Sequence, residues 1–203
     1  MCIRDSTTGV DENIVNMTYK EVRRLDAGSW YSDEYKGEKV PGLREVLELA
    51  QGKIKLNIEL KPADNGEELA RKTVALIEKY NMENDCVITS FSSSALSAAK
   101  SCDENIRVGY ILSAAYGDYY DMKNIDFFSV NAAFLSKRTI DAIHNSGKQV
   151  YAWTVNNKDS IKNLTNKGVD GVITDNPVLA RETIYSRDTS ETIVNMIRYV
   201  FNQ

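Results

Sequence analysis

Short apolar segments alternate with amphipathic helical segments along most of this chain. From residue 53 onward they follow one another at intervals of roughly 20 to 30 residues, the spacing of βα units in a parallel barrel. Strands are expected at residues 53–62, 86–91, 107–112, 127–131, 149–155 and 171–175. Most are rich in valine and isoleucine and apolar on both faces, as burial between helices and a barrel interior requires. An open doubly wound sheet is the competing architecture, but the glycine-rich phosphate loop it usually carries is not found in this sequence.

The helical segments complete this pattern. Helices are expected at residues 41–50, 67–80, 93–100, 136–145, 159–167 and 177–184. A shorter helix is expected at 17–26, where Thr18 and Glu21 have the spacing of a capping box. We expect residues 1–184 to form the barrel domain and residues 185–203 to form an amphipathic C-terminal helix packed on it.

The segment Lys53–Pro62 (KIKLNIELKP) carries polar residues where a barrel would place a site. Its apolar residues, beginning with Ile54, alternate with polar ones in the period of two that is typical of a β-strand. Glu59 and Lys61 share one face at the carboxyl end, which is the end of a parallel barrel that holds its chemistry. A carboxylate for a metal and an ammonium for an anion suit a phosphate-processing site. An amphipathic surface strand is the alternative explanation of the same pattern.

Composition excludes several classes of partner. The net charge of −4 argues against nucleic acid, because a phosphate backbone needs a basic surface. The sequence contains no apolar run long enough to span a bilayer and no recognisable secretory signal, which predicts a soluble domain. The cysteines, Cys2, Cys86 and Cys102, are odd in number and lack metal-type spacing, which argues against a disulfide framework. Cys86 opens an apolar strand pattern and is expected in the core.

Five segments together resemble one known family. In chain order, VPGLREVLELA, LNIELKP, VITSF, VYAWTVN and GVDGVITDNP are similar to segments of the glycerophosphodiester phosphodiesterase family, over roughly residues 7–184. The resemblance implies an α/β fold of the TIM-type (β/α)8 barrel class. It also implies hydrolysis of glycerophosphodiesters, such as deacylated phospholipids, to glycerol 3-phosphate and an alcohol. A divalent metal, usually Ca²⁺ or Mg²⁺, is the implied cofactor of this reaction in lipid metabolism.

The resemblance assigns roles to four residues. Glu59 matches the metal-binding glutamate of the family, and a hard cation prefers carboxylate oxygen. Lys61 matches the lysine that meets the phosphate, and it is expected to be catalytic because its charge lies where negative charge develops. Phe91 and Trp153 match aromatic positions near the glycerol side of the substrate. On its own, Trp153 would be interpreted as a core aromatic residue.

The first motifs of the family are missing from this sequence. These are a His-Arg-Gly strand, a Glu-x-Asp strand and a His-Asp motif, which supply the acid–base histidines and the other metal ligands. The Thr7–Gly9 segment resembles the residues that come directly after the His-Asp motif, so the sequence is expected to lack about the first two strands of the barrel. His144, the one histidine, lies in an expected helix and is expected to face solvent.

Two functions therefore remain open. The first is a fragment of a metal-dependent phosphodiesterase, inactive alone because its acid–base pair is missing. The second is a non-catalytic partial barrel that binds a phosphate ester or self-associates through its open sheet edge. A phosphodiesterase acting on phosphoinositides or sphingolipids would share the barrel, but the NIELK strand fits the first family better. A membrane would be reached only through a missing N-terminal region, such as some relatives carry, so localisation is left open.

Overall fold

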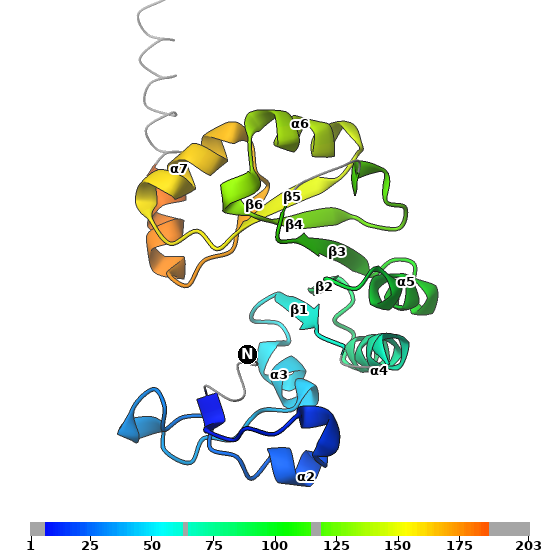
Figure 1. Cartoon of the computed structure of the whole chain (residues 1–203), viewed down its shortest axis with the longest axis vertical. Helices are drawn as coiled ribbons and strands as arrows, with labels where there is room; N and C mark the ends of the chain where they lie inside the picture. Colours follow the sequence, from blue (N-terminus) through cyan, green and yellow to red (C-terminus); the bar gives the residue numbers. More distant parts are fainter. Residues whose placement is uncertain (1–6, 63–64, 115–118, 187–203) are drawn as a thin grey trace, which may run out of the picture.

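The structure is a computed structural model that describes residues 7–62, 65–114 and 119–186. Within these residues, six parallel strands form one curled sheet whose spatial order follows the chain (Figure 1). The strands are β1 (Leu56–Leu60), β2 (Cys86–Ser90), β3 (Arg107–Leu112), β4 (Phe127–Asn131), β5 (Gln149–Trp153) and β6 (Gly171–Val172). The sequence prediction of a parallel α/β sheet of barrel type is confirmed, and the described part is a half-barrel.

Helices connect successive strands and cover the outer side of the sheet (Figure 1). They are α3 (Leu43–Ala50), α4 (Gly66–Lys79), α5 (Ser93–Cys102), α6 (Lys137–Asn145) and α7 (Lys158–Lys167), followed by helical residues 177–186. Shorter turns are η1 (Ile14–Asn16), α2 (Tyr19–Val22), η2 (Asp33–Tyr35), η3 (Tyr119–Asp121) and η4 (Ala132–Phe134). None of the helices in the described ranges is long and apolar enough to cross a bilayer.

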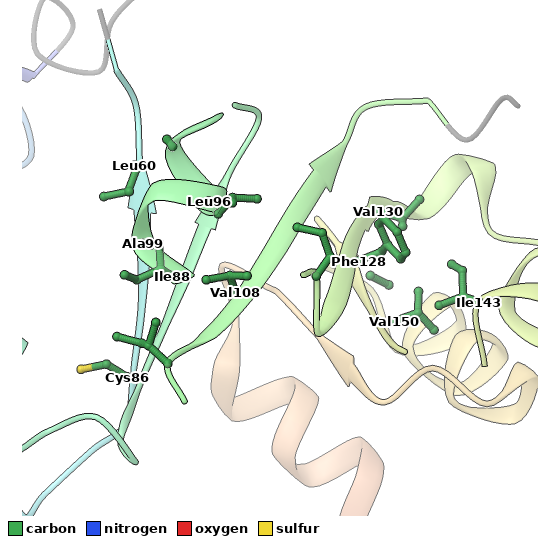
Figure 2. Packing of buried hydrophobic residues seen from close by; sticks show 14 of the residues in the cluster. Leu60, Cys86, Ile88, Leu96, Ala99, Val108, Phe128, Val130, Ile143 and Val150 are labelled. Carbon is green, nitrogen blue, oxygen red and sulfur yellow. The ribbon is translucent and has the colours of Figure 1, made fainter. Parts of the chain in front are cut away.

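The outer face of the sheet packs against these helices to form the core. Figure 2 shows Ile88, Val108 and Phe128 of successive strands beside residues of the covering helices, such as Leu96 and Ile143. These side chains are fully buried, and the burial of apolar area is the main stabilising contribution at roughly 25 cal/mol per Å². Cys86 also lies in this core, as expected, and burial raises the pKa of its thiol to about 11.

The inner face of the sheet has a different composition. The register places Glu59 of β1 opposite Thr89 of β2, then Gly109 of β3 and Phe127 of β4. Phe127 is fully buried and its ring stacks on Tyr151 of β5, with 4.7 Å between the ring centroids. Aromatic rings therefore fill this part of the barrel interior.

Two aspartates secure the amino-terminal ends of the strands. Asp126, just before β4, accepts the backbone N–H of Val108 at 2.7 Å and pairs with Lys100 of α5 at 2.9 Å. Asp170, just before β6, accepts the backbone N–H of Val150 at 2.8 Å. Each aspartate thus fixes the start of the strand that precedes it in the sheet.

A third aspartate organises the loop between α2 and α3. Asp26 accepts the backbone N–H groups of Gly28 and Ser29 at 2.9 Å and of Gly37 at 2.8 Å, and also the Ser29 hydroxyl at 2.8 Å. These donors hold the pKa of the Asp26 carboxyl well below its usual range, because they stabilise the charged form. The loop exposes three aromatic side chains in edge-to-face contact, Trp30, Tyr31 and Tyr35.

Some boundaries differ from the sequence expectation. The first strand begins at Leu56, because the N–H groups of Lys53 and Ile54 both bond to the Ala50 carbonyl and extend the end of α3. Ile54 is consequently 66% exposed, so its expected place in the alternating pattern of the strand is wrong. The Thr18–Glu21 capping box is confirmed, but α2 is shorter than the expected helix at 17–26. The C-terminal helix expected over 185–203 lies largely outside the described residues, and the domain boundary at 184 stays a prediction.

Candidate functional site

A cavity of about 360 Å³ lies on the inner face of the sheet, towards the carboxyl ends of the strands. Residues of β1 to β5, and of the segments directly after β1, β2, β5 and β6, contribute to its lining. The lining residues are Asn57, Glu59, Lys61, Thr89, Phe91, Ile111, Ser129, Trp153, Thr154 and Ile173. The cavity thus brings together all four residues singled out in the sequence, Glu59, Lys61, Phe91 and Trp153, from three different strand ends.

The charged side of the cavity is formed by β1. The alternation of the strand turns Glu59 and Lys61 to the same face, and the Glu59 Oε2 atom lies 3.4 Å from the Lys61 Nζ atom. The two side chains are 33% and 62% exposed, respectively, so solvent weakens their mutual attraction and both remain accessible to a ligand. An accessible ammonium beside a carboxylate can bind an anion and a cation side by side.

The aromatic side of the cavity is formed by Phe91 and Trp153. Their rings meet edge to face, with 6.5 Å between centroids and an interplanar angle of 87°. The indole N–H of Trp153 donates to the Ser129 carbonyl of β4 at 2.9 Å, which fixes the plane of the ring. Phe91 is 51% exposed, and this exposure leaves an apolar surface available inside the cavity.

Polar residues on the cavity wall, among them Asn57, Thr89 and Ser129, were not singled out by sequence reasoning. The hydroxyl of Thr89 donates to the Oδ1 atom of Asn57 at 2.9 Å, which fixes the orientation of an amide next to Glu59. Thr89 itself is buried. A signal for these residues exists in the sequence, because Asn57 alternates in step with Glu59, and Thr89 and Ser129 are hydroxyl residues inside otherwise apolar strands.

Titratable groups are sparse around the cavity. Across the described ranges, no three histidine, cysteine, aspartate or glutamate side chains come together as a metal site would require. Glu59 therefore provides one carboxylate ligand and not a complete site. His144 is distant from this chemistry: it lies at the amino-terminal end of the sheet, with Nε2 at 2.9 Å from the Asp170 carboxylate. It is partly exposed, in keeping with the expected solvent-facing position, but it is paired.

The arrangement suits a small ligand with an anionic end and a less polar end. Lys61 offers a positive charge, Asn57 offers an oriented amide, and the Phe91–Trp153 pair offers a flat wall. A phosphate ester of a small polyol has both of these ends. Cavities of this size typically hold such ligands with a few placed polar groups and an apolar lining.

Comparison with known proteins agrees with this chemistry. The model of the glycerophosphoryl diester phosphodiesterase family matches residues 4–179. The chain is 27% identical over 204 residues to a glycerophosphodiester phosphodiesterase of Caldanaerobacter subterraneus subsp. tengcongensis, covering 96% of this chain and 76% of that protein. It is 27% identical over 179 residues to the enzyme of the same name from Bacillus altitudinis, covering 84% and 73%.

A solved structure supports the same relationship at the level of the fold. The Oleispira antarctica phosphodiesterase, which was solved with the product sn-glycerol-3-phosphate, superposes with a TM-score of 0.76 at 29% identity. The match covers 88% of this chain and 74% of that chain. The family match extends over most of the sequence and coincides with the half-barrel and its cavity. The chain belongs to the glycerophosphoryl diester phosphodiesterase family, whose members are phosphoric diester hydrolases.

Proposed function

We propose that the cavity binds the glycerol phosphate part of a glycerophosphodiester. Lys61 meets the phosphate, and Phe91 and Trp153 contact the glycerol side. The observation that carries the proposal is the convergence of these residues, which are far apart in the chain, on one accessible cavity. The presence of sn-glycerol-3-phosphate in the Oleispira antarctica relative supports the same ligand class. In the hydrolysis, the Lys61 ammonium would stabilise negative charge on the phosphate oxygens, and this makes it the catalytic residue among those described.

A divalent cation, Ca²⁺ or Mg²⁺, is part of this proposal. Glu59 is the proposed ligand, because a carboxylate is the donor that hard cations prefer and this one faces the cavity. The cation would neutralise the diester when bound. A single carboxylate does not complete a coordination sphere of six or more oxygens, so the described residues fit one ligand position only.

We further propose that the six strands are the last six of an eight-stranded barrel. Within the described ranges, β1 and β6 each have a neighbour on one side only, whereas a TIM-type barrel closes with eight strands. The acid–base histidines would then belong to the part that is lacking, and the chain alone would bind its ligand without turning it over. Reading the coding DNA upstream of Met1 tests this: a frame continuing into a His-Arg-Gly strand supports it, and a stop codon contradicts it.

Calorimetric titration of sn-glycerol 3-phosphate, with Mg²⁺ or Ca²⁺ present, tests the binding site. Lys61→Ala is expected to weaken binding by about 10- to 100-fold, the effect of losing hydrogen bonds to a charged group. Lys55→Ala is the matched control, because Lys55 precedes the same strand but pairs with Asp85 and does not line the cavity. Glu59→Gln is expected to reduce the affinity for the cation. Equal affinities in wild type, Lys61→Ala and Lys55→Ala would contradict the proposed site.

The non-catalytic alternative rests on a separate observation. In the described part of the chain, the cavity lining contains no histidine or second carboxylate that could exchange protons with substrate. The alternative function is therefore a binding module for a phosphate ester, or a partial barrel that self-associates through the strand edges. Sedimentation of the chain with and without glycerol 3-phosphate separates the two: a monomer that binds the ligand supports the binding module, and a ligand-independent dimer supports association.

A further inference from the structure

The side chain of Asn156 joins two segments at the rim of the cavity. Its Oδ1 atom accepts the Thr174 hydroxyl at 3.0 Å and the Asp175 backbone N–H at 2.9 Å, and its Nδ2 atom donates to Asp175 Oδ2 at 2.7 Å. Both ends of one amide group are therefore used, the oxygen as an acceptor and the nitrogen as a donor. An aspartate in the same place would keep the acceptor, lose the donor and face the Asp175 carboxylate.

These bonds continue the pairing of β5 and β6 beyond the ends of the strands. The backbone ladder runs on from Ile173 N–H to the Ala152 carbonyl at 2.8 Å and from Val155 N–H to the Ile173 carbonyl at 2.9 Å. Directly after the last of these backbone bonds, the side chain of Asn156 makes the next hydrogen bonds between the two segments. Among the described residues, β6 has β5 as its one neighbour in the sheet, so the segment after β6 is joined to the sheet from this side.

The joined segments carry part of the cavity wall. Trp153 and Thr154 lie just before Asn156, and Ile173 lies just before Thr174; all three residues line the cavity. The indole of Trp153 is fixed from the other direction by its bond to the Ser129 carbonyl. The position of the aromatic wall thus depends on β4 at one end and on the Asn156 bonds at the other.

The same bonds reach the next helix along the chain. The Thr174 hydroxyl, which donates to Asn156, accepts the Asn176 N–H at 3.0 Å. Asn176 in turn caps helical residues 177–186 by accepting the Leu179 N–H at 3.1 Å. Asn156 is therefore the start of a continuous set of bonds from the end of β5 to the start of this helix.

We propose that Asn156 is a positioning residue, which holds the Trp153–Thr154 segment against residues 173–175 and so fixes the aromatic side of the cavity. The expected effect on ligand affinity rests on the proposed function. The expected effect on the position of the indole does not. Asp175 is the partner of Asn156 in this role, and the pair consists of one amide and one carboxylate.

Three variants test this pairing in a Trp30→Phe background, in which Trp153 is the remaining tryptophan. Asn156→Asp removes the donor and sets two carboxylates against each other. Asp175→Asn sets two amides together. The double variant Asn156→Asp/Asp175→Asn restores one carboxylate and one amide in exchanged positions. Asn157→Asp is the matched control, since it adds the same charge at the next residue and an aspartate still caps α7, as Asn157 does by accepting Ser160 N–H at 2.8 Å.

Two measurements are made on each variant: the Trp153 emission spectrum without ligand, and the dissociation constant of sn-glycerol 3-phosphate. Asn156→Asp is expected to shift the emission and to weaken binding by about tenfold, the effect of breaking a hydrogen-bonded pair that involves a charged group. The double variant is expected to recover both properties, and Asn157→Asp to change neither. A simple loss of stability would not be repaired by exchanging the two groups.

The outcomes separate this proposal from the proposed function. If emission shifts and recovers as expected while the wild type does not bind glycerol 3-phosphate, Asn156 positions Trp153 and the proposed ligand is wrong. If the wild type binds but Asn156→Asp leaves both emission and affinity unchanged, the positioning role is wrong. Failure of the double variant to recover while it remains folded by circular dichroism would overturn the role as well.

Discussion

The ring of Phe127 lies directly against the α-carbon of Gly109 on the neighbouring strand. A Cβ atom added to Gly109 would lie 2.1 Å from the Phe127 ring, far inside any van der Waals contact. The absence of a side chain at Gly109 of β3 is therefore what allows the aromatic layer of buried Phe127 and half-buried Tyr151 to form.

The substitution Gly109→Ala is expected to destabilise the protein by about 1–3 kcal/mol, because overpacking forces the ring or the strand to shift. Urea unfolding followed by circular dichroism measures the change in free energy of unfolding. The double variant Gly109→Ala/Phe127→Leu should recover part of the loss, since the smaller side chain leaves room for the methyl group. Equal free energies of unfolding for Gly109→Ala and wild type would contradict this, because they would show that the two strands make room for the methyl group without a loss of stability.

The substitution Trp153→Phe is expected to weaken glycerol 3-phosphate binding by about 3- to 10-fold. It removes the hydrogen bond to the Ser129 carbonyl and reduces the aromatic surface that meets Phe91. Calorimetric titration gives the affinity, and Trp30→Phe is the control because Trp30 lies on the loop after Asp26. A loss of the same size in both variants would argue against a specific wall at Trp153.

The 203-residue chain is expected to bind glycerol 3-phosphate but not to release it from deacylated phospholipids. His144 is occupied with Asp170 at the opposite end of the sheet, so it cannot transfer protons at the cavity. An enzyme-coupled assay for glycerol 3-phosphate, run with Ca²⁺ and with Mg²⁺, measures release. Metal-dependent turnover by the purified chain that is lost in Lys61→Ala would reject the inactive-fragment proposal.

The contribution of Asp26 to stability is expected to depend on pH. Its carboxyl has a lowered pKa in the folded state, so folding favours the charged form. That contribution is complete above the unfolded pKa of about 3.9 and declines as pH falls further towards the folded pKa. Thermal midpoints of wild type and Asp26→Asn should therefore differ most above about pH 5, and the difference should shrink progressively as the pH falls below about 4 towards the folded pKa. A difference that is constant over this range would show that the carboxylate charge is not what the loop requires.

Sequence reasoning predicted the order and type of the elements because the helices have a clear period and recognisable caps, and the strands between them are short and mostly apolar. Ile54 was misplaced, since alternation alone cannot show that the backbone still belongs to the end of α3. The pairing of Trp153 with Ser129 could not be predicted, because it depends on the register between two strands that are distant in sequence. The proximity of Glu59 and Lys61 follows from local geometry alone, and for this reason it could be expected from one segment.

The aspartates before β4 and β6 secure two pairs of strands in the same way, β3 with β4 and β5 with β6. In each pair the carboxylate bonds to the preceding strand and also to a basic residue near the end of the helix that leads into that strand, Lys100 of α5 in one case and His144 of α6 in the other. The alignment of these strands is thus set at the amino-terminal end of the sheet, away from the proposed ligand cavity. Substitutions around the rim of the cavity are accordingly expected to leave the alignment of these strands in place.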